Sequence, residues 1–246
     1  FMPIVDDPFD FGRIAATNAI SDVYAMGGRP IMALALVAMP VNVLSGASIA
    51  RILEGGASVC TAAGIPIAGG HSIDSVEAIY GLMVMGLAHP GRIRRNADAR
   101  PGDVLVLGKP LGVGVMSAAL KKGALDAAGY AAMLDCTTRL NTPGPDLAAI
   151  SGVHAVTDVT GFGLAGHALE MARGAGVTVE LDWDKVPLLP GVGQLAVRDC
   201  GRHAVQRLSA IDQHRRLPAE LQRHRHQILA GGAHHRQLRG HDGVAG

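Results

Sequence analysis

Four polar side chains lie close together in a stretch whose apolar residues recur at helical spacing. At positions i, i+1, i+4 and i+5 they share one face of the expected helix: Thr17, Asn18, Ser21 and Asp22. A solvated helix face usually carries Lys, Glu and Arg, whereas this one carries small hydrogen-bonding groups around a single carboxylate. Because Mg²⁺ takes one or two protein oxygens and completes its coordination with phosphate and water, the set predicts a metal–phosphate site. The alternative is a polar surface stripe near the end of a helix.

A second candidate is the Gly-Gly-His-Ser sequence at residues 69–72, which follows an expected strand. Paired glycines let the backbone approach a ligand closely, and successive N–H groups can bind an anion. His71 could contact a ligand, although a histidine in such a turn more often makes a structural hydrogen bond. The loop is therefore a candidate phosphate contact, although a weak one in isolation.

The third candidate is the Thr-Asp-Val-Thr-Gly-Phe-Gly sequence at residues 157–163, which leads into an expected helix. Asp158 follows an expected strand, at the position where open α/β sheets place ligand groups. Gly161 and Gly163 permit a sharp turn, and the N-terminus of the following helix favours anions. The alternative is that Asp158 caps the helix or the turn.

The elements that would position these residues can be predicted from apolar periodicity. Helices are expected at 9–26, 45–63, 112–122, 131–140 and 162–173, and strands at 31–38, 65–68, 79–88, 103–107, 153–157 and 177–181. Asp10 is the expected N-cap of the first helix, which Gly27 and Gly28 end. The run at 31–38 is apolar throughout, which is typical of a strand buried on both faces.

Composition predicts two α/β domains followed by a tail of different character. The polar stretch 92–101 suggests a division into residues 1–97 and 98–201. Residues 202–246 then hold eight Arg and seven of the 11 His, and apolar periodicity almost vanishes. This tail is interpreted either as a non-native end produced by a reading-frame shift or as a His-rich metal-binding tract.

Charge and cysteine usage exclude several classes of protein. A net charge of +1 over 246 residues gives no electrostatic case for a nucleic-acid or membrane-surface partner. The longest apolar stretch, residues 31–41, contains Pro40 and falls far short of the roughly 20 residues that span a bilayer. The three cysteines are Cys60, Cys136 and Cys200, and they lie too far apart in the sequence for a disulfide framework or a metal knuckle. This spacing predicts a protein of the reducing cytoplasm.

The motifs, taken in order and spacing, resemble one family. Residues 16–22, 26–28, 69–74 and 157–164 resemble the selenophosphate synthetases, also called selenide, water dikinases, and the similarity runs from residue 1 to about residue 201. Related families on the same fold include aminoimidazole ribonucleotide synthetase, thiamine-monophosphate kinase and a hydrogenase maturation factor. In place of the Gly-Gly-His-Ser sequence they favour a Gly-Gly-Asp-Thr or Gly-Gly-Glu-Thr turn, and they lack the sequence motif found here at 157–163.

The resemblance implies a two-domain fold of the aminoimidazole ribonucleotide synthetase type, α/β (α+β) in class and incomplete at both ends here. The family is usually a homodimer whose N-terminal domains together form a barrel. Its reaction converts ATP, selenide and water to selenophosphate, AMP and phosphate. By resemblance, residues 1–97 form the ATP-binding, metal-binding and dimerisation domain, and residues 98–201 form part of the C-terminal α/β domain.

The resemblance also carries residue roles onto matching positions. Asp22 and Asp158 would bind Mg²⁺, and Asp22 would also contact ATP. Gly70, His71 and Ser72 would contact ATP from the partner subunit, and Asn18 would join the phosphate-side network. This proposal requires the two aspartates to converge beside residues 69–72.

One departure from the family leaves two functional hypotheses open. The family's reactive Cys or selenocysteine, with a Lys, lies in an N-terminal segment that has no counterpart here, so no catalytic residue is assigned in this chain. The chain is then either the core of a selenophosphate synthetase or a non-catalytic nucleotide-binding and dimerisation module. A related small-molecule kinase or synthetase is disfavoured by the Gly-Gly-His-Ser sequence.

Overall fold

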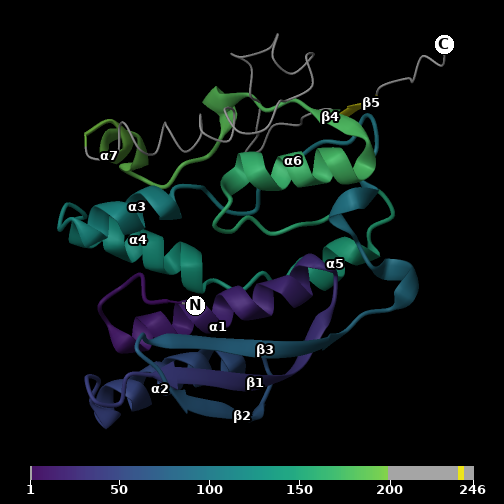
Figure 1. Ribbon diagram of the computed structural model, residues 1–246. Coiled ribbons are helices and arrows are strands. Elements are labelled where there is room, and N and C mark those ends of the chain that lie inside the picture. The colour runs from purple at the N-terminus through teal and green to yellow at the C-terminus, as the bar shows by residue number, and fades with distance from the viewer. Residues whose placement is uncertain (1, 199–237, 241–246) are drawn as a thin grey trace. The chain divides into compact units, whose positions relative to one another are not determined.

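The computed structural model describes residues 2–198 and 238–240, so most of the tail discussed above lies outside the described residues. The chain divides into two compact units (Figure 1). The first comprises residues 1–95 and 134–158, and the second comprises residues 96–133 and 159–246. Residues 134–158 therefore belong with the first unit. The domain boundaries at residues 97 and 201 stay predictions.

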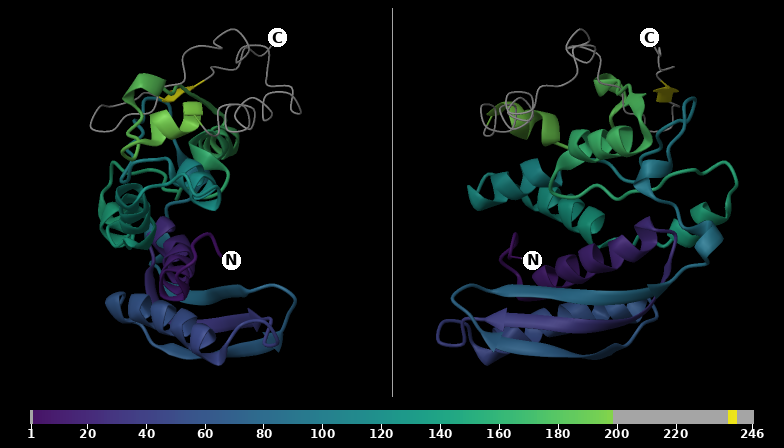
Figure 2. Two further views of the ribbon diagram at one scale, coloured as in Figure 1. Left: turned by 90° about the vertical axis from the view of Figure 1, so that its left-hand side faces the viewer. Right: turned by 45° about the vertical axis from the view of Figure 1, so that its right-hand side comes forward.

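The first unit is a three-stranded sheet with α1 and α2 packed on one face (Figure 2). Its elements are α1 (Pro8–Ala25), β1 (Arg29–Met39), α2 (Gly46–Ala62), β2 (Ile67–Asp74), β3 (Ile79–Leu87), the 3-10 turn η1 (Pro90–Arg92) and α5 (Gly144–Ala149). The strand order is β2–β1–β3, with β1 parallel to β2 and antiparallel to β3. Ala16, Ile20, Ala33 and Val59 are among the buried core residues between helices and sheet. The predicted first two helices and the strands at 31–38 and 79–88 are confirmed.

The N-cap of α1 lies about one turn before the predicted residue. Asp7, rather than Asp10, is the N-cap, and its carboxylate accepts a hydrogen bond of 2.9 Å from the backbone N–H of Asp10. Pro8 occupies the first helical position, where its missing N–H costs nothing and its φ suits the helix. The helix therefore begins earlier, and Asp10 pairs with Arg13 instead.

Glycines let α1 and α2 approach each other closely. A Cβ added at Gly12 would lie 2.0 Å from the carbonyl oxygen of Ile52, and one at Gly55 would lie 2.0 Å from that of Phe9. Gly56 similarly leaves room for the hydroxyl of Tyr80. The glycine pair that weakens α2 as an isolated helix is thus required by the tertiary contact.

The Gly-Gly-His-Ser sequence lies within a strand, so the expected turn at residues 69–72 is wrong. β2 runs through it, and the pairing with β1 contains a bulge between the Ala33 and Ala35 registers. Gly69 and Gly70 have φ values of 140° and 155°, and a Cβ at Gly70 would lie 2.0 Å from the carbonyl oxygen of Ala35. The two glycines therefore permit a bulge within β2 rather than ending the strand.

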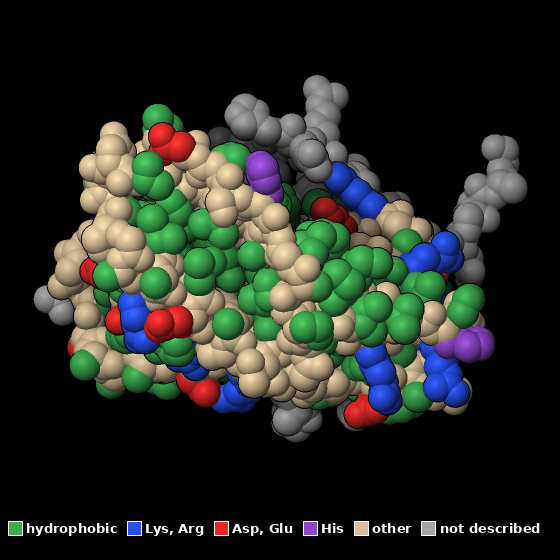
Figure 3. Space-filling view, turned by 90° about the horizontal axis from the view of Figure 1, so that it is seen from below, with side chains coloured by type: hydrophobic (Ala, Val, Ile, Leu, Met, Phe, Trp, Pro, Cys, Tyr) green, Lys and Arg blue, Asp and Glu red, His purple; other side chains and the backbone are tan. Residues whose placement is uncertain are grey.

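One face of the sheet is apolar and open, so the expectation that β1 is buried on both faces is wrong for this chain. Leu36, at the centre of β1, is 56% exposed, and Met83 and Met85 of β3 are exposed beside it. Hydrophobic side chains gather over this part of the first unit in the view from below (Figure 3). We name this surface the open sheet face and define it by its exposed residues: Leu36, Ile73, Ile79, Met83 and Met85.

The second unit is built mainly of helices. Its elements are η2 (Asn96–Asp98), α3 (Val113–Lys121), α4 (Ala127–Thr138), α6 (Gly163–Ala175), β4 (Val177–Val179), η3 (Trp183–Lys185), α7 (Val192–Arg198) and β5 (Leu238–Gly240), and the last residues of α4 belong to the first unit. β4 and β5 pair antiparallel. The three predicted helices are confirmed, and the predicted strand at 177–181 is confirmed as the shorter β4. Both units mix helices and strands, in agreement with the predicted α/β class.

Two predicted strands are absent from the structure at 103–107 and 153–157. The first segment keeps the alternation of a strand, because Leu105 and Leu107 pack on the core while Val106 is 77% exposed. No ladder partner for either segment occurs among the described residues, which explains why apolar alternation alone misled the prediction. Among residues 2–198 and 238–240, no helix has the length and apolar character to cross a membrane.

We expect Gly55→Ala to destabilise the chain, because the new methyl group would overlap the Phe9 carbonyl and push α1 from α2. The expected loss is about 2–4 kcal/mol in the free energy of unfolding, measured by urea denaturation. Gly46→Ala is the matched control, since nothing lies within 4 Å of the added Cβ in the first turn of the same helix. Equal stability of the two variants would contradict the packing role of Gly55.

Candidate metal and nucleotide site

Two carboxylates from distant segments meet in the first unit. Asp22 lies in the last turns of α1, and Asp158 ends the 134–158 segment. The Ser21 hydroxyl, next to Asp22, donates a hydrogen bond of 2.7 Å to Oδ2 of Asp158. Asp22 is exposed at the surface, yet partial burial of its carboxyl group and then the negative charge of Asp158 raise its pKa. The structure thus brings the two predicted aspartates together.

A residue that the sequence did not single out completes this arrangement. The side-chain amide of Asn141 donates a hydrogen bond of 2.9 Å to the Ser21 hydroxyl. Asn141 lies between α4 and α5, 120 residues from Ser21 along the chain. No local motif marks it, because only the folded position of its segment brings it to α1.

The polar face of α1 is divided between two environments. Thr17 and Ser21 are buried, and their hydroxyls reach Thr138 and Asp158 of the 134–158 segment. Asn18 and Asp22 are exposed beside them. The polar face is therefore neither a plain surface stripe nor a single site. Thr17 and Ser21 contact the 134–158 segment, whereas Asn18 and Asp22 are exposed to solvent.

Close backbone contacts hold the 134–158 segment along α1. A Cβ added at Gly144 would lie 2.2 Å from the Tyr24 carbonyl oxygen, and one at Gly27 would lie 2.4 Å from the Ala148 side chain. Arg94 also donates a hydrogen bond of 2.6 Å to the Ala148 carbonyl. These contacts lie at the end of α1 that carries Asp22, so they fix the approach of the segment that ends at Asp158.

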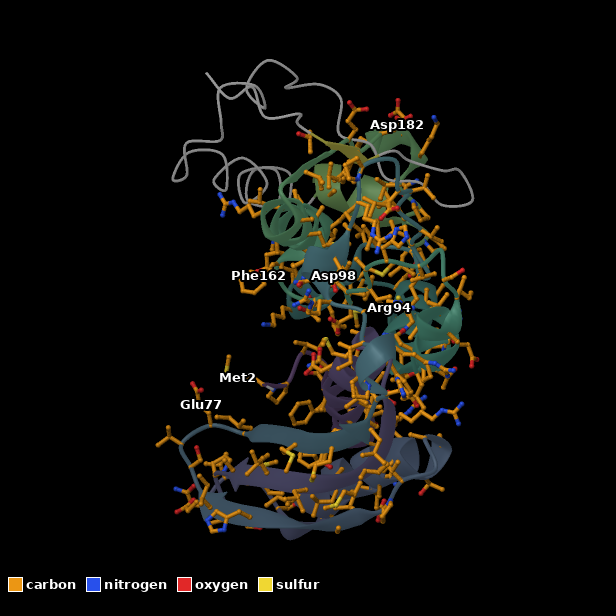
Figure 4. All side chains as sticks on the ribbon, turned by 90° about the vertical axis from the view of Figure 1, so that its right-hand side faces the viewer. Met2, Glu77, Arg94, Asp98, Phe162 and Asp182 are labelled. Atoms are coloured by element: carbon orange, nitrogen blue, oxygen red, sulfur yellow. The ribbon has the colours of Figure 1, made fainter. Side chains whose placement is uncertain are left out.

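Asp158 does not cap the helix that follows it, so the helix-capping alternative is wrong. The N-cap of α6 is Phe162, whose exposed side chain projects from the start of the helix (Figure 4). Gly163 has a φ of 69°, as the sharp turn requires. Within the second unit, the backbone N–H of Thr160 donates to Nε2 of His167 at 3.1 Å, which holds the loop.

Residues 69–72 lie apart from the aspartates within one chain. They belong to β2, at the edge of the sheet, whereas α1 packs chiefly over β3 at the opposite edge. Among the described residues, neither His71 nor Ser72 hydrogen-bonds to Asp22 or Asp158. The two aspartates therefore lie together, as expected, whereas residues 69–72 of the same chain do not lie beside them.

The acidic pair suits a hard divalent cation. Partial burial and then the negative charge of Asp158 raise the pKa of Asp22, and a cation between the two carboxylates would remove their repulsion. The described residues contain no cluster of three or more His, Cys, Asp or Glu side chains able to hold a metal. A pair is nevertheless sufficient for Mg²⁺, which keeps several waters and takes further oxygens from phosphate.

The two described cysteines are unsuited to nucleophilic chemistry. Cys60 and Cys136 form no disulfide, and both are buried in the interior. Burial raises the pKa of the Cys60 thiol and so disfavours the reactive thiolate.

The fold and sequence define a class of protein. Residues 1–88 match the N-terminal domain of the AIR synthase related proteins, and residues 100–199 match their C-terminal domain. The chain belongs to this family. Within it, the sequence is 71% identical over 192 residues to a selenide, water dikinase of Burkholderia ambifaria (strain MC40-6) and 68% identical over 196 residues to one of Pseudomonas straminea. These matches confirm the resemblance to selenide, water dikinases.

The matches cover 78% and 80% of this chain but only 54% and 55% of those relatives, so the chain spans about half their length. Solved structures agree on the fold. A thiamine-monophosphate kinase from Stenotrophomonas maltophilia K279a has a TM-score of 0.70 at 21% identity, over 97% of this chain and 78% of that one. The hydrogenase maturation protein HypE in complex with ATP has a TM-score of 0.71 at 19% identity, over 98% and 73%. The predicted aminoimidazole ribonucleotide synthetase-like fold is thereby confirmed.

We expect Asp22→Asn to stabilise the metal-free chain at pH 7. The raised pKa means that ionised Asp22 disfavours the folded state above its folded pKa, and that this cost disappears as the pH falls towards the unfolded value of 3.8. Because Asp22 is exposed, the gain should be less than about 1 kcal/mol at pH 7, and it should be absent below pH 3.8.

Urea denaturation in the presence of a chelator measures this gain at each pH. Glu77→Gln, at the exposed connection between β2 and β3, is the control (Figure 4). A gain from Asp22→Asn that stays constant across the pH range would contradict an electrostatic origin.

Proposed function

We propose that the chain is the ATP- and Mg²⁺-binding core of a selenophosphate synthetase, whose reaction converts ATP, selenide and water to selenophosphate, AMP and phosphate. The observation that carries the proposal is the meeting of Asp22 with Asp158, where Ser21 bridges a separation of 137 residues to reach Asp158. The similarity to selenide, water dikinases supports the particular substrates.

In this proposal Asp22 and Asp158 hold Mg²⁺, which neutralises phosphate charge when bound. Asn18 is exposed one helical turn before Asp22, where its amide can donate to a phosphate oxygen. Asp22 also contacts the ATP and so helps to orient it. The residues of the chain thus bind and position the polyphosphate rather than form covalent bonds with it.

A homodimer through the open sheet face would supply the remaining contacts. Leu36 and the other apolar residues of the open sheet face are exposed to water, so their burial against a second copy of the chain would be favourable. Gly70, His71 and Ser72 lie on the exposed edge strand β2, so a partner's aspartates could meet them although those of the same chain do not. A reducing cytoplasm fits Cys60 and Cys136, neither of which forms a disulfide.

Leu36→Asp tests the dimer. A charge at the centre of the open sheet face should weaken self-association at least about 100-fold, because an unpaired carboxylate would be buried in the interface. Sedimentation equilibrium should then show a monomer with an unchanged circular dichroism spectrum. Val76→Asp is the control, since Val76 is 95% exposed on the connection between β2 and β3. Dimerisation of Leu36→Asp at wild-type strength would exclude this face.

A second candidate function is a nucleotide-binding and dimerisation module without catalysis. It is favoured by the burial of both described cysteines, which leaves this part of the chain without an accessible thiol. The enzyme proposal therefore needs a reactive group from the remaining length of the family protein.

A chimera separates the two functions. We expect the chain, joined to the N-terminal segment of the Burkholderia ambifaria relative, to form AMP from ATP only when selenide and Mg²⁺ are present. Asp22→Asn and Asp158→Asn should each lower this activity at least about 1,000-fold without unfolding the protein. The exposed Asp146→Asn on α5 should retain it. Full activity in either site variant would refute the site, whereas MgATP binding without AMP formation in the chimera favours the module.

A further inference from the structure

A chain of two hydrogen bonds leads from Asn141 through Ser21 to Asp158. The distances are 2.9 Å from the Asn141 amide nitrogen to the Ser21 oxygen and 2.7 Å from that oxygen to Oδ2 of Asp158. Ser21 is only 6% exposed, and the other two residues are half-buried. Hydrogen bonds in such surroundings are stronger and better ordered than those on the surface.

The direction of this chain is determined by its end groups. The amide nitrogen of Asn141 can only donate, so the Ser21 oxygen must accept from it. The carboxylate of Asp158 can only accept, so the Ser21 proton must point to it. Asn141 therefore sets the rotation of the Ser21 hydroxyl, and Ser21 in turn sets the orientation of the carboxylate.

We infer that Ser21 and Asn141 are positioning residues for the metal site, which hold the Asp158 carboxylate ready for a divalent cation beside Asp22. The inference rests on the proposed function, because it assumes that the acidic pair binds a metal. A carboxylate has about four acceptor positions, so the Ser21 bond to Oδ2 leaves the others for the cation.

A purely structural role is the competing explanation, since the same bonds tie α1 to the 134–158 segment. The chain offers a matched comparison for it. Arg13 donates a hydrogen bond of 3.1 Å to the Thr138 hydroxyl and so joins α1 to the same segment two turns earlier. Thr138→Val removes that tie without touching Asp158, whereas Ser21→Ala removes the tie that orients the carboxylate.

The experiment measures Mn²⁺ affinity of the full 246-residue chain by the electron paramagnetic resonance signal of free Mn²⁺. Ser21→Ala should weaken binding about tenfold, as is typical when a hydrogen bond to a metal ligand is lost. Asn141→Ala should weaken it about threefold, because the Ser21 hydroxyl then keeps its bond to Asp158 but loses the donor that helps to orient it. Ser21→Thr, which keeps the hydroxyl, should restore affinity, and Thr138→Val should bind as the wild type does.

Melting temperatures of the metal-free variants show whether each one folds, and Asn141→Ala keeps the test decisive if Ser21→Ala fails to fold. Wild-type affinity in folded Ser21→Ala and Asn141→Ala would overturn the inference and leave the metal site standing. Loss of affinity in Thr138→Val equal to that in Ser21→Ala would make the role structural and also overturn it. Failure of the wild-type chain to bind Mn²⁺ would overturn the metal site together with the inference.

Discussion

The hydrogen bond between Ser21 and Asp158 is the interaction on which the candidate site depends. It joins the end of α1 to a segment that begins in α4. The bond lies beside Asp22, whose negative charge repels that of Asp158. The packing of Gly144 and Ala148 against the same end of α1 keeps this approach close. The first unit therefore holds two like charges near each other, which is typical of a site that receives a cation.

Sequence reasoning predicted the acidic residues because their chemical type and local context are informative. Asp22 stood among small polar groups on a helix, and Asp158 stood before a glycine-containing turn. Asn141 could not be predicted in the same way, since its role depends on a contact across 120 residues. The misplaced N-cap had a local cause: Pro8 is compatible with the first turn of a helix, so the helix begins at Pro8 and its N-cap is Asp7.

The strands were predicted less well for a physical reason. Apolar alternation reports which side of a segment is buried, and Leu105 and Leu107 show that pattern without a ladder partner. Glycine pairs were also ambiguous, since Gly69 and Gly70 form a bulge within β2 rather than a turn. The continuous apolar run of β1 predicted burial on both faces, and the open sheet face at Leu36 marks where a second copy is proposed to provide it.

The return of residues 134–158 to the first unit affects the order in which the chain can fold during synthesis. The three described strands and the two helices that cover them have all emerged from the ribosome once residue 95 has left it, because β3 ends at Leu87. The buried hydroxyls of Thr17 and Ser21, however, then still lack their partners, Thr138 and Asp158. Until residue 158 emerges, the nascent unit exposes one side of α1 to water, and its acidic pair does not yet exist.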